Sequence, residues 1–251
     1  MSSPWFQILR EAPDARLRLF CFASAGSGAS AYRSWLPFLP PWLDLVAVQP
    51  PGREGRSRET ALRRLEDIVD ALVAELPEAT VSRPFAFFGH SLGGRVAFEL
   101  ARQLEETQRP SPTHVVIAAS MEPSVLSDLD RRCHLLPDAE FEAYAATFGA
   151  FLEELRRFPR QFKAVMDLLR ADLEIFATAA FPVDPPLRAP LTVFGGRGDL
   201  AVTPGCLEPW RARAASRFAI EWHDGGHFFP VQQPAATVAR LTALLDPAGP
   251  T

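Results

Sequence analysis

The sequence has few cysteines, no long apolar run and no surplus of basic residues, and each absence excludes a class of protein. Its three cysteines, Cys21, Cys133 and Cys206, are odd in number and widely spaced, which excludes a disulfide framework and matches no metal-ligand pattern. No apolar run approaches the roughly 20 residues that a membrane-spanning helix needs. The formal net charge of −4 argues against a nucleic-acid-binding protein, which shows a basic surplus on one face.

The remaining composition is typical of a globular protein with a large core. Of the 251 residues, 47% are hydrophobic, and no segment in the middle of the chain resembles an interdomain linker. The N-terminus lacks a basic region followed by an apolar segment, so no signal peptide is indicated. We therefore expect one domain over residues 1–251, monomeric, with reduced thiols, in the cytoplasm and not bound to a membrane.

Apolar runs of strand length alternate with amphipathic helical patterns along most of the chain. Such alternation predicts an α/β fold with a mostly parallel sheet covered by helices on both faces. The predicted strands are 16–23, 43–48, 84–88, 113–120, 190–196 and 218–222. The predicted helices are 32–39, 60–76, 95–104, 209–215 and 234–245.

A serine lies between two glycines where one of these strands gives way to a helix. The segment Gly89-His90-Ser91-Leu92-Gly93 is a G-x-S-x-G sequence, the spelling of a nucleophile elbow. The serine of such an elbow sits on a strained turn with its hydroxyl above the sheet edge, and bulkier residues at the glycine positions would collide with the neighbouring strand and helix. We therefore predict that Ser91 is a catalytic nucleophile.

A serine nucleophile needs a base, and the base needs an acid that fixes its tautomer. In α/β-hydrolases the chain order is nucleophile, acid, histidine, and Ser91, Asp199 and His227 occur in that order, the last two after predicted strands. His227 is preferred to the other histidines because it follows the last strand. Asp224 and Asp172 are alternatives to Asp199.

An early glycine-bearing loop, residues 24–28, follows the strand at 16–23. In hydrolases of this type one oxyanion-binding N–H comes from such a loop and the other from the residue after the nucleophile. Ala25 and Leu92 are therefore the predicted oxyanion donors. The alternative for residues 24–28 is an ordinary tight turn.

Between Met121 and Val183 the alternation of strands and helices stops, and no segment has the pattern of a strand. Helical patterns at 138–155 and 160–180 carry many large apolar side chains, among them Phe148 and Phe151. These helices are predicted to form a mobile lid over an acyl-binding pocket. The alternative is that their apolar residues only pack the helices onto the sheet.

Five motifs, in order, give the chain a family resemblance over nearly its whole length. It resembles the type II thioesterases of nonribosomal peptide and polyketide synthases, although Ser27 replaces the second glycine of the family's early loop and Gly55 stands where the family often has an acid. The motifs are Phe22-Ala23-Ser24-Ala25-Gly26, Gln49-Pro50-Pro51-Gly52-Arg53-Glu54, the elbow through Gly94, Gly195-Gly196-Arg197-Gly198-Asp199 and Gly225-Gly226-His227-Phe228-Phe229.

The resemblance implies an α/β-hydrolase fold and hydrolysis of acyl groups from the phosphopantetheine arm of acyl or peptidyl carrier proteins, with a Ser-His-Asp mechanism and an acyl-enzyme intermediate. It implies no metal and no cofactor of the enzyme's own, because the phosphopantetheine belongs to the partner. The alternatives are a product-releasing thioesterase, a small-molecule carboxylesterase and a noncatalytic binding module. For the partner we consider a docking patch on a group of basic residues, with a merely solvated basic face as the alternative. The group is Arg53, Arg56, Arg58, Arg63 and Arg64.

Overall fold

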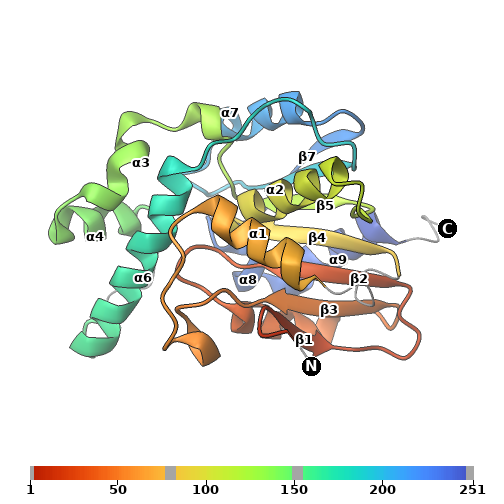
Figure 1. Ribbon diagram of the computed structural model, residues 1–251, viewed down its shortest axis with the longest axis horizontal. Coiled ribbons are helices and arrows are strands. Elements are labelled where there is room, and N and C mark those ends of the chain that lie inside the picture. The colour runs from red at the N-terminus through yellow and green to blue at the C-terminus, as the bar shows by residue number, and fades with distance from the viewer. Residues whose placement is uncertain (1–2, 77–82, 149–154, 247–251) are drawn as a thin grey trace.

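The computed structural model describes residues 3–76, 83–148 and 155–246. Within these residues, seven strands form one sheet in the order β1-β3-β2-β4-β5-β6-β7 (Figure 1). The strands are β1 Phe6–Arg10, β2 Leu17–Phe22, β3 Leu43–Val48, β4 Phe85–His90, β5 Val115–Ala118, β6 Leu191–Gly196 and β7 Phe218–His223.

All strand pairs are parallel except β1 with β3. Strands β2 to β6 are buried at every position, which is why they occur in the sequence as almost continuous apolar runs. The mostly parallel sheet confirms the predicted fold class. Strand β1 was not predicted, because this edge strand is only half-buried and mixes polar with apolar residues.

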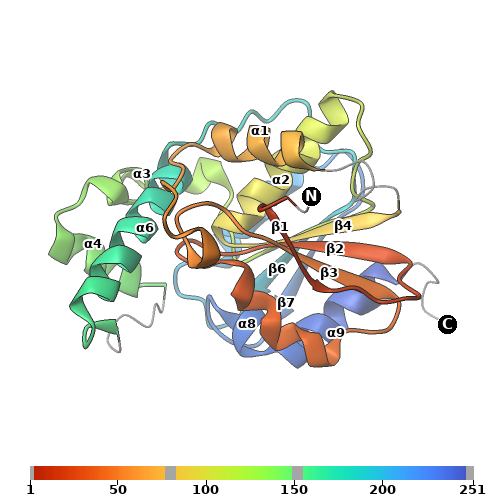
Figure 2. The same ribbon diagram turned by 60° about the horizontal axis from the view of Figure 1, so that its bottom comes forward.

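Helices cover both faces of the sheet (Figure 2). On one face α1 and α2 pack over an apolar cluster that includes Phe20 and Phe87, and on the other η1 and α9 pack over a cluster that includes Trp35 and Phe88. The helices outside the segment between β5 and β6 are η1 Ala29–Phe38, η2 Glu54–Arg56, α1 Leu65–Glu75, α2 Leu92–Glu106, α7 Pro204–Leu207, η6 Glu208–Arg213, α8 Phe229–Gln232 and α9 Pro234–Leu245.

Two of these helices differ from their predicted bounds. Helix α1 begins at Leu65, five residues later than predicted, because residues 60–64 are not helical and the backbone of Arg64, directly before the helix, is extended. Helix α2 begins at Leu92, directly after Ser91, and therefore earlier than its apolar periodicity indicated.

The segment between β5 and β6 is helical in its described part and contains none of the strands of the sheet, as predicted. Helices α3, α4 and α6 lie together at the end of the molecule where the carboxyl ends of the parallel strands point (Figure 1). Residues 149–154, including Phe151, lie outside the described part. The elements are η4 Pro123–Val125, α3 Asp128–Arg132, η5 Cys133–Leu135, α4 Asp138–Ala146 and α6 Pro159–Thr178.

Candidate active site

Ser91 occupies a strained turn between β4 and α2. Its φ of 54° and ψ of −117° lie outside the regions that ordinary residues prefer, and its N–H donates to the Ala118 carbonyl at 2.8 Å. A Cβ at Gly89 would lie 2.2 Å from the Gly93 carbonyl oxygen, and one at Gly93 would lie 2.1 Å from that of Phe22. Both glycines are therefore required by the close packing of the elbow.

His227 and Asp199 reach Ser91 from the loops that follow β7 and β6. His227 Nε2 lies 3.1 Å from Ser91 Oγ, and Nδ1 lies 2.8 Å from Asp199 Oδ2. A carboxylate only accepts hydrogen bonds, so Nδ1 carries the proton and Nε2 is free to accept the serine proton. The structure brings together the three side chains of the predicted triad in the contacts that a serine nucleophile needs.

Asp199 is itself held by its surroundings. The second carboxylate oxygen, Oδ1, accepts the N–H groups of Ala201 and Val202, each at 3.0 Å, and the residue is buried. These two bonds fix the carboxylate plane, so Oδ2 points at the histidine.

The two alternative carboxylates lie elsewhere. The Asp224 side chain is 86% exposed, and its nearest charged partner is Arg197 at 3.6 Å. Asp172 is buried in α6, where it pairs with Arg53. Neither contacts His227 among the described residues, so the geometry favours Asp199 as the acid.

His90, which was not among the predicted site residues, supports the backbone of His227. Its Nε2 lies 2.8 Å from the His227 carbonyl oxygen, and the His90 side chain is buried. Burial, followed by the charge of His227, lowers the pKa of His90 to about 3, so the ring is neutral and Nε2–H is the donor. The only sequence signal for this role is its place directly before Ser91.

The two predicted oxyanion donors share one cavity with Ser91. Ala25 and Leu92 both line it, and within the described residues neither of their N–H groups donates to a protein acceptor. Leu92 is the first residue of α2, where the helix dipole adds partial positive charge. Both groups are therefore available for the negative oxygen of a tetrahedral intermediate.

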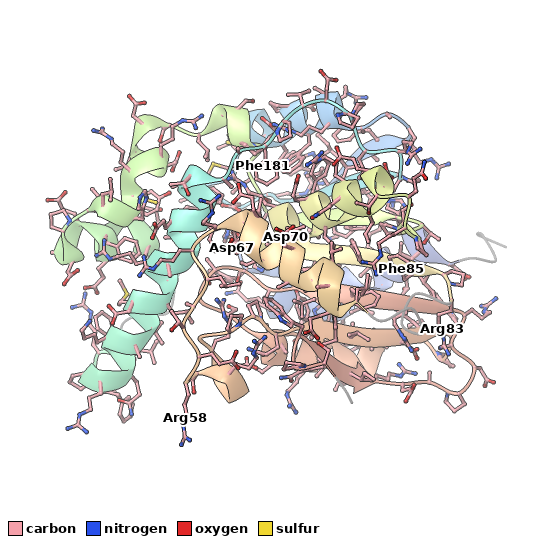
Figure 3. The ribbon with its side chains drawn as sticks, in the orientation of Figure 1. Arg58, Asp67, Asp70, Arg83, Phe85 and Phe181 are labelled. Carbon is pink, nitrogen blue, oxygen red and sulfur yellow. The ribbon has the colours of Figure 1, made fainter. Side chains whose placement is uncertain are left out.

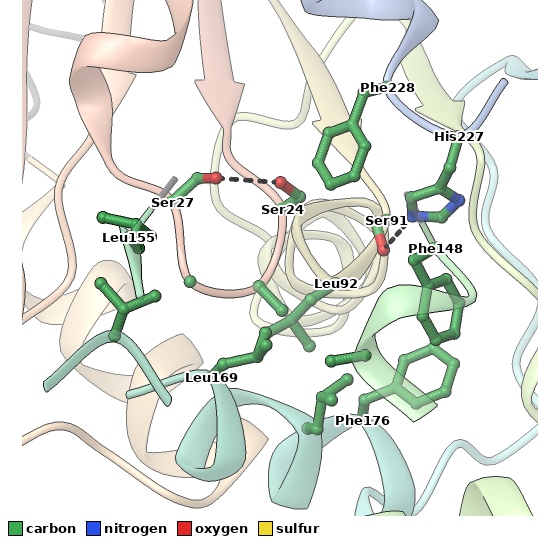
Figure 4. Close-up of a pocket in the computed structure, with 15 residues that line it drawn as sticks. Ser24, Ser27, Ser91, Leu92, Phe148, Leu155, Leu169, Phe176, His227 and Phe228 are labelled. Atoms are coloured by element: carbon green, nitrogen blue, oxygen red, sulfur yellow. Dashed lines mark hydrogen bonds between the residues drawn. The ribbon is translucent and has the colours of Figure 1, made fainter. Parts of the chain in front are cut away.

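The cavity has a volume of about 250 Å³ and is mostly apolar (Figure 4). One wall is the loop after β2, and the opposite wall comes from α6 and the end of α4. The Phe148 ring packs edge-on against the His227 ring, with centroids 5.1 Å apart. The apolar lining residues include Ala145, Phe148, Leu155, Val165, Leu169, Leu173, Phe176 and Phe228.

The arginine group considered for docking does not lie together at the surface, because one of its members is buried. Arg53 is buried against Asp172 and is not available at the surface. Arg56 and Arg63 pair with Glu59 and Glu174, and Arg64 lies within 4.0 Å of Glu66 and Asp67. Arg58 points away from the molecule and has no acidic partner in the described part of the chain (Figure 3).

Among the described residues, no group of three or more His, Cys, Asp or Glu side chains could hold a metal ion. None of the helices there is long and apolar enough to span a membrane.

Comparison with known proteins places the sequence and fold among thioesterases. A thioesterase-domain family model matches residues 17–245. The gramicidin S biosynthesis protein GrsT of Aneurinibacillus migulanus is 34% identical over 225 residues, which cover 90% of this chain and 87% of GrsT.

Two solved structures agree over almost the whole chain. RedJ, a thioesterase from the prodiginine biosynthetic pathway in Streptomyces coelicolor, is 31% identical with a TM-score of 0.83, and 94% of each chain is covered. YbtT, a type II thioesterase from the yersiniabactin nonribosomal peptide and polyketide pathway, is 28% identical with a TM-score of 0.84, covering 95% of this chain and 96% of YbtT.

Proposed function

The chain belongs to the thioesterase family, and we propose that it is a type II enzyme that hydrolyses acyl groups from the phosphopantetheine arm of carrier proteins. The observation that carries this proposal is the contact of Ser91 with His227 and of His227 with Asp199 beside an apolar cavity. The cavity suits an acyl chain, and the similarity to GrsT, RedJ and YbtT supports a synthase-bound carrier as its source.

The reaction has two halves. Ser91 Oγ attacks the thioester carbonyl carbon while His227 Nε2 takes the hydroxyl proton, and the Ala25 and Leu92 N–H groups bind the oxyanion. His227 then gives the proton to the leaving pantetheine sulfur, and the acyl group remains on Ser91. In the second half His227 activates water, which releases the carboxylic acid and restores the serine.

The proposed chemistry uses the protein's own side chains and water. The enzyme brings no cofactor of its own, because the pantetheine thiol belongs to the carrier. One copy of the chain suffices, since both oxyanion donors and all three triad residues come from the same chain. The free thiols of Cys21, Cys133 and Cys206 suit the reducing cytoplasm, where we place the reaction.

A survey of carrier proteins loaded with different acyl groups tests the function. With wild-type enzyme, mass spectrometry should show loss of the acyl group from some carriers, and Ser91→Ala should leave all of them loaded. A fluorophosphonate should label Ser91 and no other residue. Turnover by Ser91→Ala, or labelling at a different residue, would remove Ser91 from the mechanism.

The same survey, run with oxygen esters beside the acyl carriers, separates the alternatives. Faster hydrolysis of oxygen esters than of acyl carriers would indicate a small-molecule carboxylesterase. Hydrolysis confined to one full-length product would indicate a releasing enzyme, whereas hydrolysis of several short or misloaded groups is expected for an editing enzyme. A protein that hydrolyses none of them would be a binding module.

A further inference from the structure

The loop that carries Ala25 is hydrogen-bonded to a buried carboxylate. The N–H of Gly26, the next residue, donates to Asp172 Oδ2 at 2.7 Å. Asp172 belongs to α6 and is 1% exposed. A charge is seldom buried without a partner, so this contact requires a cation close by.

That cation is Arg53, which donates hydrogen bonds to both the carboxylate and the loop. Arg53 Nη1 and Nη2 donate to Asp172 Oδ2 and Oδ1 at 2.7 and 2.8 Å, a two-point contact of the kind that fixes orientation. Nη1 also donates to the Ser27 carbonyl at 3.1 Å. The loop is therefore held at the Gly26 N–H by Asp172 and at the Ser27 carbonyl by Arg53.

We propose that Asp172 and Arg53 are positioning residues that aim the Ala25 N–H at the oxyanion. This proposal rests on the proposed function. Neither side chain touches the reacting atoms; they act through the backbone of residues 25–27. Gly26 has a φ of +74°, and a glycine adopts positive and negative φ values about equally readily. Its own backbone preference therefore does not fix the direction of the Ala25 N–H, and contacts from outside the loop must do so.

The position of the pair also connects the loop to the acyl-binding wall. Leu169 and Leu173 flank Asp172 on α6, and both line the cavity. Leu169 lies against Gly26, since a Cβ there would be 3.5 Å from Leu169 Cδ1. The same turns of α6 thus contact the acyl chain and hold the oxyanion loop. A buried ion pair is a weak source of stability compared with apolar packing, so fixing this geometry accounts for it better.

Asp172→Asn is the first test, because it keeps the size of the side chain but removes the charge that holds Arg53. With a small acyl thioester that needs no carrier, kcat should fall by about 10²-fold, as when one oxyanion donor is lost. Affinity for a non-hydrolysable thioether analogue, measured by calorimetry, should stay within about twofold, because the lost interaction forms only in the transition state. Thermal unfolding is measured alongside.

Glu174→Gln is the matched control. Glu174 lies on the same helix and also pairs with an arginine, Arg63, but it does not contact the oxyanion loop. Its kcat should equal that of the wild type. Equal losses in the two variants, an unchanged kcat in Asp172→Asn, or a weakened affinity with kcat preserved would each overturn the proposal.

Arg53→Lys gives a second reading should Asp172→Asn not fold. Lysine keeps the positive charge near Asp172 but cannot make the two-point contact and reach Ser27 as well. A fall in kcat with unchanged analogue affinity supports the proposal, and wild-type kcat overturns it. If the wild type itself hydrolyses no acyl thioester, the proposed function fails, which is distinct from any result for the variants.

Discussion

Each residue of the Ser91, His227 and Asp199 set is held by a contact that its chemistry requires. The elbow strains the serine backbone and exposes its hydroxyl, two backbone N–H groups orient the acid, and His90 holds the histidine backbone. A hydroxyl, an imidazole and a carboxylate with freedom to rotate would spend little time in reactive contact. The supporting contacts are therefore as much part of the site as the reacting atoms.

Asp199→Asn tests the choice of acid. An amide can present its NH₂ group to His227 and favour the wrong tautomer, so activity should fall by roughly 10⁴-fold, by analogy with serine proteases. Steady-state kinetics on a small acyl thioester measures the loss, and circular dichroism checks the fold. Asp224→Asn is the control and should be almost silent. A larger loss in Asp224→Asn would show that Asp199 is the wrong carboxylate.

The lowered pKa of His114 makes the stability of the fold depend on pH. Its Nε2 lies 2.8 Å from Thr192 Oγ1, and burial, followed by the charge of Arg217, lowers its pKa to about 4. The pKa of His114 in the unfolded chain is about 6.5. Between about pH 6.5 and pH 4 the unfolded chain therefore binds a proton at His114 that the folded protein does not bind, so the stability of the fold decreases as pH falls. Through His114, the free energy of unfolding falls by about 1.4 kcal/mol for each pH unit in this range, or by roughly 2 kcal/mol in all at pH 5.

Urea unfolding at pH 7 and pH 5 measures this dependence. His114→Gln should lose less stability on acidification than the wild type, by about that amount. Thr192→Val removes the hydrogen bond but keeps the histidine, so it should lower stability at both pH values without flattening the dependence. A His114→Gln variant as acid-sensitive as the wild type would contradict the assignment.

At the scale of elements, function depends on how the helical segment between β5 and β6 meets the loops of the sheet. Helix α6 supplies Leu169, Leu173 and Phe176 to the cavity, and the turn after α4 brings Phe148 against His227. Other residues of this segment, such as Phe141, only pack in the core. Both interpretations drawn from the sequence thus apply, to different residues. Movement of the segment as a lid stays a prediction.

Phe148→Ala should shift the preference toward longer acyl chains, because it removes a ring from the cavity wall. The ratio of kcat/KM for a long and a short acyl thioester is the proper measure, since any shared effect on His227 cancels in it. Phe158→Ala, a change at a side chain that is 57% exposed, should leave the ratio unchanged. An unaltered ratio in Phe148→Ala would place the acyl chain elsewhere. The paired prediction for Phe151 concerns a residue outside the described part.

At the scale of the molecule, the buried sheet and the order of the triad could be predicted because each leaves a local signal. Continuous apolar runs mark β2 to β6, and glycines mark the elbow. The Arg53 to Asp172 contact leaves no such signal, because the two residues are far apart in the sequence and meet only when α6 folds over the loop. The same reason explains why Arg53 was mistaken for a surface charge.

The arginine group considered as a docking patch for the proposed carrier partner belongs to this scale as well. A basic patch attracts an acidic partner only when its charges are not already neutralised. Acidic neighbours of Arg56, Arg63 and Arg64 neutralise most of the group considered from the sequence, whereas Arg58 has no such neighbour among the described residues. The structure therefore favours the alternative, a solvated face that takes no large part in docking.

Charge reversal at Arg58 and Arg64 tests this conclusion directly. Both side chains are exposed and lie outside the cavity lining, so Arg58→Glu with Arg64→Glu should leave hydrolysis of a small acyl thioester unchanged. For an acyl carrier protein, kcat/KM should also stay within about twofold at low ionic strength, where surface attraction is strongest. A selective loss of tenfold or more with the carrier, relieved by added salt, would restore this face as the docking site, because only long-range charge attraction has that salt dependence.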